Sequence, residues 1–189
     1  VLGANEKFDM LSYLDETKVT SGSKIRRGDI LKVKEFKPSV SHDDRTRYFL
    51  KIQDGCDYYC SFCTIPLARG HSRSGTITET VKISREIIAQ GAKEIVLTGV
   101  NTGEFGKRNG EKFIGLIQAL DEIDAEVRFR ISSVEPNLLT EEIVRFVAES
   151  KHFMPHFHIP LQSGSNAVLQ LMKRRYSTED FAEKAAIIR

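Results

Sequence analysis

The chain has 189 residues, of which 40% are hydrophobic and 29% charged, so one ordinary domain with a buried core is expected. Its 28 Lys and Arg residues nearly balance 26 Asp and Glu residues, and the net charge of +2 does not by itself indicate a nucleic-acid-binding protein. No apolar run approaches the length of a membrane span, and no signal peptide is recognisable. We therefore expect a cytoplasmic protein with no membrane partner.

Residues 1–45 are polar and are punctuated by Gly22, Gly28 and Pro38, which predicts a connector with one short strand near residues 30–36. The chain opens on Val1, and its first seven residues resemble the tail of a preceding domain. Several Lys and Arg residues crowd this segment. A solvated face is the simplest interpretation of such a run.

From residue 46 the pattern changes to alternating strands and helices. Short apolar or alternating runs predict strands at residues 48–52, 94–98, 127–131 and 156–161. Caps and helical apolar spacing predict helices that start at Thr76, Phe113, Thr140, Ser165 and Ser177 or Thr178. Successive β/α units imply parallel strands with right-handed crossovers, in a barrel or in an open doubly wound sheet. Both architectures place active sites at the carboxyl ends of their strands.

The chain has three cysteines, and all lie in one short segment with the spacing C-x3-C-x2-C: Cys56, Cys60 and Cys63. An odd number of clustered cysteines argues against disulfides and for a reducing compartment. A structural zinc site would need a fourth ligand, which His71 or His42 could supply, but such sites usually contain a second Cys or His pair. The spacing favours a four-iron cluster in which three thiolates leave one iron open.

With an aromatic residue before its third cysteine, this motif resembles the radical S-adenosylmethionine (SAM) superfamily. Further motifs resemble its methylthiotransferase branch: residues 55–74, 97–103, 132–136, 158–165 and 172–176. The resemblance covers about residues 45–189. The segments around Asn101 and Glu135 look most like the subgroup that modifies N6-threonylcarbamoyladenosine in tRNA.

The resemblance implies an α/β fold, a partial six-unit (β/α) barrel with parallel strands, of which about four units are present. It also implies that residues 1–45 connect to an N-terminal domain and that residues 46–189 form the partial barrel. In this family Cys56, Cys60 and Cys63 would bind a [4Fe–4S] cluster, whose fourth iron chelates SAM.

The remaining candidate site residues are cofactor-binding: Phe62, Gly99, Asn101, Ser133, Glu135, Gln162, Ser163 and Arg174. For several of them a structural role is equally open. Phe62 could be a packing aromatic, Asn101 a turn residue, and Glu135 a helix-cap or salt-bridge residue. Arg174 could orient the carboxylate of SAM through two parallel hydrogen bonds or could pair with a neighbouring acidic side chain.

Four neighbouring side chains have weaker interpretations. Tyr58 and Tyr59 could stack on a flipped base or simply cover the cluster. His156 and His158 share one face of the expected fourth strand, where they would line the barrel more readily than bind a metal. We expect Lys173 and Arg175 to face solvent.

The resemblance implies a tRNA methylthiotransferase that inserts sulfur and a methyl group at C2 of N6-threonylcarbamoyladenosine beside the anticodon. Its partners would be tRNA and an electron-donor protein, and a second [4Fe–4S] cluster would sit in the N-terminal domain. Sulfur insertion is therefore expected of the full-length protein. Alternatives are a methylthiotransferase acting on N6-isopentenyladenosine tRNA or on a ribosomal protein, and a non-enzymatic zinc-binding RNA module.

Overall fold

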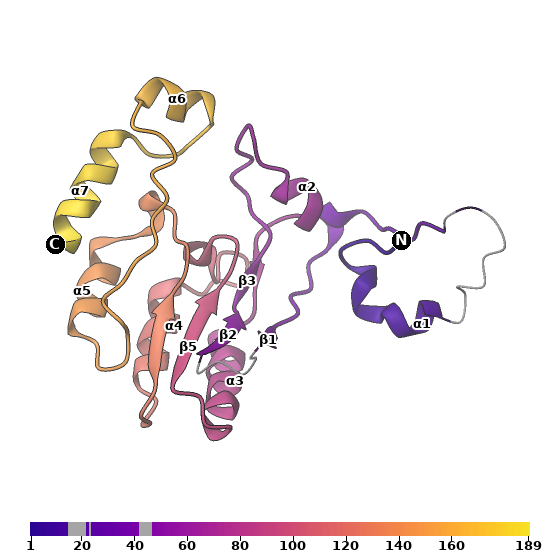
Figure 1. Ribbon diagram of the computed structural model, residues 1–189, viewed down its shortest axis with the longest axis horizontal. Coiled ribbons are helices and arrows are strands. Elements are labelled where there is room, and N and C mark those ends of the chain that lie inside the picture. The colour runs from indigo at the N-terminus through magenta and orange to yellow at the C-terminus, as the bar shows by residue number, and fades with distance from the viewer. Residues whose placement is uncertain (15–21, 23, 42–46) are drawn as a thin grey trace.

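A four-stranded sheet organises the chain in the computed structural model, which describes residues 1–14, 22, 24–41 and 47–189. The strand order is β1-β2-β5-β6. Strands β2 (Arg47–Lys51), β5 (Glu94–Thr98) and β6 (Arg128–Ile131) run parallel, and β1 (Ser39–Ser41) adds antiparallel to β2 at one edge (Figure 1). The predicted α/β class with parallel strands is confirmed, and the described strands form part of a barrel.

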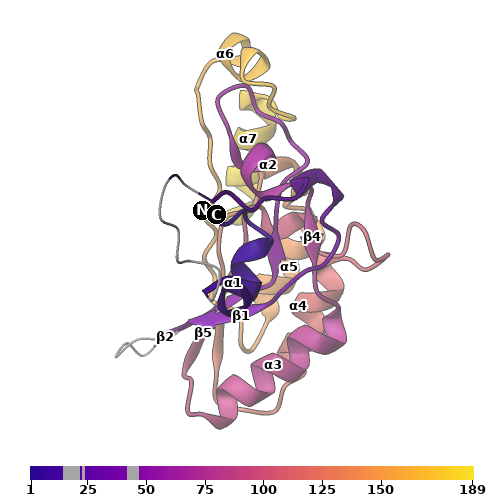
Figure 2. The ribbon, with the colours of Figure 1, turned by 90° about the vertical axis from the view of Figure 1, so that its right-hand side faces the viewer.

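Helices α3 (Ile77–Ala89) and α4 (Phe113–Asp121) connect the parallel strands and lie along the same side of the sheet (Figure 2). Helix α5 (Glu141–Glu149) follows β6. As predicted, Thr76 caps α3 in a reciprocal capping box with Glu79, and Gly91 follows its end with a φ of 94°. Thr140 accepts a hydrogen bond from the Ile143 amide at the start of α5.

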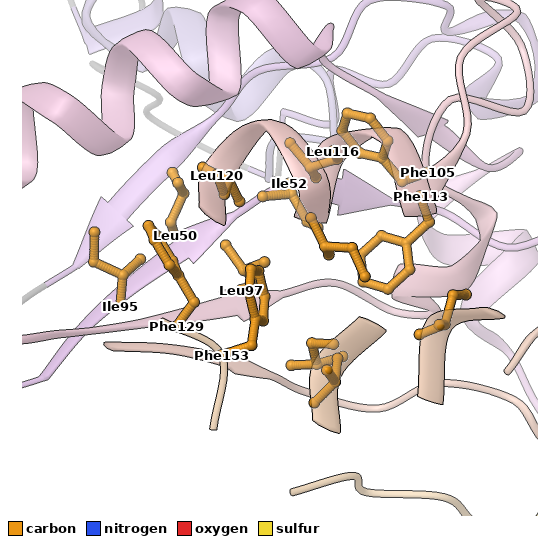
Figure 3. Packing of buried hydrophobic residues seen from close by; sticks show 14 of the residues in the cluster. Leu50, Ile52, Ile95, Leu97, Phe105, Phe113, Leu116, Leu120, Phe129 and Phe153 are labelled. Carbon is orange, nitrogen blue, oxygen red and sulfur yellow. The ribbon is translucent and has the colours of Figure 1, made fainter. Parts of the chain in front are cut away.

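The core lies between these helices and the sheet. In β2, β5 and β6 it includes Leu50, Leu97 and Ile131, which occupy paired positions on adjacent strands. Leu116 and Leu120 of α4 pack over them and are completely buried (Figure 3). The apolar residues whose spacing predicted α4 therefore face the core. The polar residues of the site lie at the carboxyl ends of the strands.

The expected strand at residues 156–161 is wrong. This segment forms one isolated parallel bridge, between His158 and Ser133, and Phe153 just before it forms another with Phe129 of β6. Pro155 lies between the two bridges and Pro160 follows them. Proline has no N–H to donate to a ladder, so the chain runs alongside β6 without forming a continuous strand. The following helices, α6 (Asn166–Leu171) and α7 (Thr178–Ile188), are present as expected.

The strand expected near residues 30–36 is also wrong. A short 3-10 helix, η2 (Ile30–Lys32), begins there, because the side chain of Asp29 accepts the Leu31 amide and closes a tight turn. The remaining elements are short: η1 (Glu6–Asp9), α1 (Met10–Leu14), β3 (Gln53–Asp54), α2 (Ile65–Arg69), β4 (Arg73–Ser74), η3 (Thr102–Glu104) and η4 (Pro136–Leu138).

The division of the chain at residues 45 and 46 falls outside the described residues and stays a prediction. None of the helices in the described part is long and apolar enough to span a membrane.

Candidate iron–sulfur and cofactor site

A cavity of about 790 Å³ opens at the carboxyl ends of β2 and β5, a volume typical of small-molecule sites. Most of the predicted site residues line it: Cys56, Cys60, Phe62, Cys63, Gly99, Asn101, Glu135, Gln162 and Arg174. Segments separated by more than a hundred residues therefore contribute to one space. The cysteine loop (residues 55–72), α2 and α6 lie at the end of the molecule toward which β5 points (Figure 1).

The cysteine loop is closed at its base by the short antiparallel pair of β3 and β4. The Cys56 amide donates to the Gly70 carbonyl at 3.1 Å. Gly55 has a φ of 70°, and a Cβ placed on it would lie 2.0 Å from the carbonyl oxygen of His71. Only glycine allows this approach, so Gly55 fixes the point at which the loop leaves the sheet.

All three cysteines are free thiols; Cys60 is buried, and the other two are half-buried. Burial raises the pKa of Cys56 to about 11, and burial also raises the pKa of Cys60. These thiols are therefore protonated at neutral pH when no metal is bound, and a metal must displace their protons to bind. Three thiols on one loop beside a cavity match the donor set of a [4Fe–4S] cluster.

A single zinc ion fits this site less well. In the described residues no group of three or more His, Cys, Asp or Glu side chains is arranged to hold one metal ion. Of the two possible fourth ligands, His71 places its Nδ1 2.9 Å from Oδ1 of Asp57, and His42 lies outside the described residues. His156 and His158 are exposed, and His158 pairs with the Ser133 hydroxyl at 2.7 Å.

Gln53 joins the cysteine loop to the loop after β5, and the sequence analysis did not single it out. This side chain is completely buried. Its Nε2 donates to the Asp54 carbonyl at 3.1 Å, to the Gly55 carbonyl at 2.8 Å and to the Ser72 hydroxyl at 2.9 Å. Its Oε1 accepts the amides of Val100 and Asn101, each at 2.9 Å. A completely buried glutamine that bonds to the backbone of two loops holds those loops together. The structure shows this role, whereas the spacing of residues in the sequence does not.

A polar group behind the cysteine loop was also not predicted. The Lys107 ammonium lies 3.1 Å from Asp57 and 2.7 Å from the buried Glu104, which in turn accepts the Asp57 amide at 3.4 Å. These contacts lower the pKa of Asp57, with His71 and Lys107 as its main hydrogen-bond partners, against the effect of its burial. The carboxylate of Asp57, next to Cys56, is thus directed toward His71 and Lys107 and is kept charged.

Glu135 and Arg174 form a buried ion pair at the cavity wall. The guanidinium donates to Oε1 of Glu135 at 3.0 Å, and the side chains are 14% and 5% exposed. Burial raises the pKa of Glu135, although Arg174 opposes this. The Arg174 guanidinium also lies 5.3 Å from the ring centroid of Phe62, which is 57% exposed.

This pair has unused hydrogen-bonding capacity. Three buried atoms at the cavity have no hydrogen-bond partner within the described protein: Glu135 Oε2, Arg174 Nε and Asn101 Nδ2. Buried polar atoms are rarely left unpaired, so a ligand with both donor and acceptor groups suits this wall. SAM carries an ammonium, a carboxylate and ribose hydroxyls. Arg174 can therefore pair with Glu135 and still offer its unpaired Nε to a ligand.

The other candidates are placed as follows. Gly99 approaches Gln53 so closely that an added Cβ would lie 2.8 Å from its Oε1. Gln162 lines the cavity with a φ of 65°, a conformation that non-glycine residues adopt at a cost and most often at functional sites. Ser133 and Ser163 do not line the cavity, and the Ser163 hydroxyl accepts the Ser165 amide at 3.1 Å.

Arg175 is exposed, as expected, but it also makes two contacts with the cysteine loop. Its Nη2 donates to the Asp57 carbonyl at 2.8 Å, and its guanidinium lies 4.2 Å from the ring centroid of Tyr58. Tyr58 itself is buried and donates its hydroxyl to Asn137 at 2.9 Å. Tyr58 therefore has no free face for a base, whereas Tyr59 is 41% exposed.

Comparisons with known proteins agree with this chemistry. Residues 50–189 match the model of the radical SAM superfamily. The chain is 38% identical over 188 residues to threonylcarbamoyladenosine tRNA methylthiotransferase MtaB of Bacillus subtilis, covering 97% of this chain and 42% of that protein. It is 31% identical over 185 residues to tRNA-2-methylthio-N(6)-dimethylallyladenosine synthase of Clostridium tetani, covering 96% of this chain and 40% of that protein.

A solved structure shows the same fold at lower identity. It is a radical S-adenosylmethionine methyltransferase, TsrM, from Kitasatospora setae with cobalamin and a [4Fe–4S] cluster bound. The TM-score is 0.60 at 17% identity, over 74% of this chain and 26% of that one. The chain spans about two fifths of the length of the curated relatives it matches. From the match over residues 50–189 and the cysteine loop at the cavity, we conclude that this chain belongs to the radical SAM superfamily.

Proposed function

We propose that the protein containing this chain is a tRNA methylthiotransferase that adds a methylthio group at C2 of N6-threonylcarbamoyladenosine beside the anticodon. The observation that carries the proposal is the 38% identity, over nearly the whole chain, to a relative named for that substrate. The relative named for dimethylallyladenosine is 31% identical, so that nucleoside is the second candidate.

Radical SAM proteins use a [4Fe–4S] cluster and SAM, and the cluster when bound supplies the electron that cleaves the sulfonium. We assign the cluster to Cys56, Cys60 and Cys63. The cavity wall then orients the cofactor: Arg174 and Glu135 offer complementary charges to its carboxylate and ammonium, while Asn101 offers an unused amide donor. Phe62 contributes an aromatic ring to the same cavity, and Gly99 contributes a stretch of backbone with no side chain.

Three further features belong to this proposal. An N-terminal domain, which residues 1–45 would connect to the partial barrel, holds a second [4Fe–4S] cluster that takes part in sulfur insertion. An electron-donor protein reduces the clusters. The free, clustered cysteines suit the reducing environment of the cytoplasm, where the tRNA substrate is found.

The test is nucleoside analysis with the full-length protein, reconstituted anaerobically with iron and sulfide. The substrate is tRNA from a strain that lacks the methylthio modification, supplied with SAM and a reductant. We expect mass spectrometry to show 2-methylthio-N6-threonylcarbamoyladenosine, and none with the Cys60→Ala protein. Methylthiolation of dimethylallyladenosine instead would assign the second candidate, and modification of neither nucleoside would refute the proposal.

A further inference from the structure

The cavity that holds the three thiols continues to a group of cations around the ring of Phe8. The Nζ atoms lie near the ring centroid, at 5.1 Å for Lys7, 5.0 Å for Lys37 and 5.7 Å for Lys51. We call these four residues the lysine–phenylalanine cluster. They come from η1, from the segment before β1 and from the end of β2. Lys7, Phe8 and Lys51 line the same cavity as the cysteines.

Positive charge is poorly balanced at this end of the cavity. Within the described residues, Asp54 is the one carboxylate that forms ion pairs here, and it is shared by Lys51 at 3.7 Å, Arg69 at 3.1 Å and Arg73 at 3.3 Å. Lys7 and Lys37 have no carboxylate partner in the described part of the chain. Burial lowers the pKa of Lys51; Asp54 opposes this, whereas the positive charges of Lys7, Arg69 and Arg73 lower the pKa further. Like charges held this close repel one another, and a bound anion would relieve that repulsion.

Aromatic faces accompany this charge. Phe8 is 41% exposed and Phe49 is 37% exposed, and both line the cavity. A positively charged groove with exposed aromatic rings is the usual arrangement for single-stranded nucleic acid, because phosphates meet the cations and unpaired bases stack on the rings. A base pair inside a duplex does not offer its flat face, so this arrangement favours unpaired nucleotides.

We propose that the lysine–phenylalanine cluster is the mouth through which the RNA substrate enters: a phosphate draws the ammonium groups of Lys7 and Lys37 off the ring, and an unpaired base stacks on the face of Phe8 that they leave. The target nucleotide then reaches toward the cysteines along the cavity. This inference rests on the proposed function, since it takes the substrate to be tRNA, and it adds the surface and the chemistry that recognise it.

The test measures binding of a fluorescein-labelled RNA hairpin with an adenosine-containing loop to the reconstituted full-length protein. Fluorescence anisotropy is followed over a range of salt concentrations, with a loopless duplex of the same stem for comparison. We expect Phe8→Ala to weaken hairpin binding about 5- to 150-fold, as for the loss of one stacked base. Lys37→Gln removes one phosphate contact and should reduce the slope of log K against log salt by about 0.7.

Lys82→Gln is the matched control, because Lys82 is exposed on α3, away from the cavity. Melting followed by circular dichroism confirms folding, and the surface variant Lys37→Gln keeps the test valid if Phe8→Ala unfolds. Wild-type hairpin affinity in both variants, in a protein that still methylthiolates tRNA, would overturn the assignment and leave the proposed function standing. If the wild-type protein neither binds the hairpin nor methylthiolates tRNA, the RNA assignment and the proposed function are both refuted.

A partner of another class gives a different outcome. If Lys37→Gln leaves RNA affinity unchanged but slows reduction by flavodoxin, an acidic electron-transfer protein, the cluster binds a protein partner. That result would overturn the RNA assignment.

Discussion

Oε1 of Gln53 accepts the backbone N–H of Asn101 at 2.9 Å, across 48 positions of the chain. The Nε2 of the same amide donates to Gly55, immediately before the first cysteine. One buried side chain therefore fixes the relative position of the loop that carries the thiols and the loop that carries a candidate cofactor contact. Gln53 lines the same cavity, but the hydrogen bonds of its side chain go to backbone groups of the two loops and to Ser72, and we regard it as a positioning residue.

Replacing Gln53 with Met should destabilise the metal-free protein by at least about 2 kcal/mol, because several buried backbone groups would lose their partners at once. Urea denaturation measures this loss of unfolding free energy. Iron content and SAM affinity should fall together in the variant, since both loops lose the same support. Gln118→Met, at an exposed position of α4, is the control. Equal unfolding free energies for the two variants would contradict the role of Gln53.

Changing any one of Cys56, Cys60 or Cys63 to Ala should abolish the [4Fe–4S] cluster, since two thiolates do not hold it. The measurements are iron and sulfide content and the visible absorbance after anaerobic reconstitution. The wild-type protein should be brown and should bind SAM. Stoichiometric zinc without iron uptake in the wild type would instead support a zinc-binding module.

Arg174→Lys should weaken SAM binding about ten- to a hundredfold, because Lys keeps the charge but cannot offer two parallel hydrogen bonds; charge-assisted bonds contribute about 1.5–3 kcal/mol. Isothermal titration with the reconstituted protein measures the affinity. Arg85→Lys, at an exposed position of α3, is the control. Equal affinities would leave Arg174 with the Glu135 ion pair alone and would remove it from the cofactor site.

Arg175→Gln should loosen the cysteine loop, because it removes the contact with the Tyr58 ring and changes the bond to the Asp57 carbonyl. A cation–π contact at an exposed site contributes about 0.5–1 kcal/mol, so amide hydrogen exchange in the loop should rise about two- to fivefold. Lys173→Gln, at the exposed position two residues before, is the control. Unchanged exchange would show that Arg175 does not support the loop.

Much of this protein could be predicted from its sequence, and the failures have physical reasons. The central strands and helices were predictable because their apolar spacing and caps are local signals, as in α3 with its Thr76–Glu79 capping box. The segment at residues 156–161 has the apolar pattern of a strand, but its neighbouring prolines prevent continuous pairing. The η2 turn depends on a single Asp29 side-chain contact, which an apolar pattern does not report.

The same division holds at the site. That Cys56, Asn101 and Glu135 lie at one cavity could be predicted, because parallel strands bring their carboxyl ends together, whereas Ser133 and Ser163 lie outside that cavity and their cofactor role stays a prediction. Gln53, Arg175 and the cations around Phe8 were not, because their roles depend on contacts between distant segments. The bond of Arg175 to the Asp57 carbonyl, for example, spans 118 positions. Neither the spacing of residues nor the composition shows which residues so far apart in the sequence will be in contact.

The position of Gln53 also sets an order of events when the protein is made. Its amide stays without two of its partners until Val100 and Asn101 have been synthesised and β5 has paired with β2. The backbone around the first thiol therefore takes its final shape only after that part of the sheet exists. We expect iron and sulfide to be delivered to a chain whose central strands are already paired, so that maturation of the metal centre follows folding.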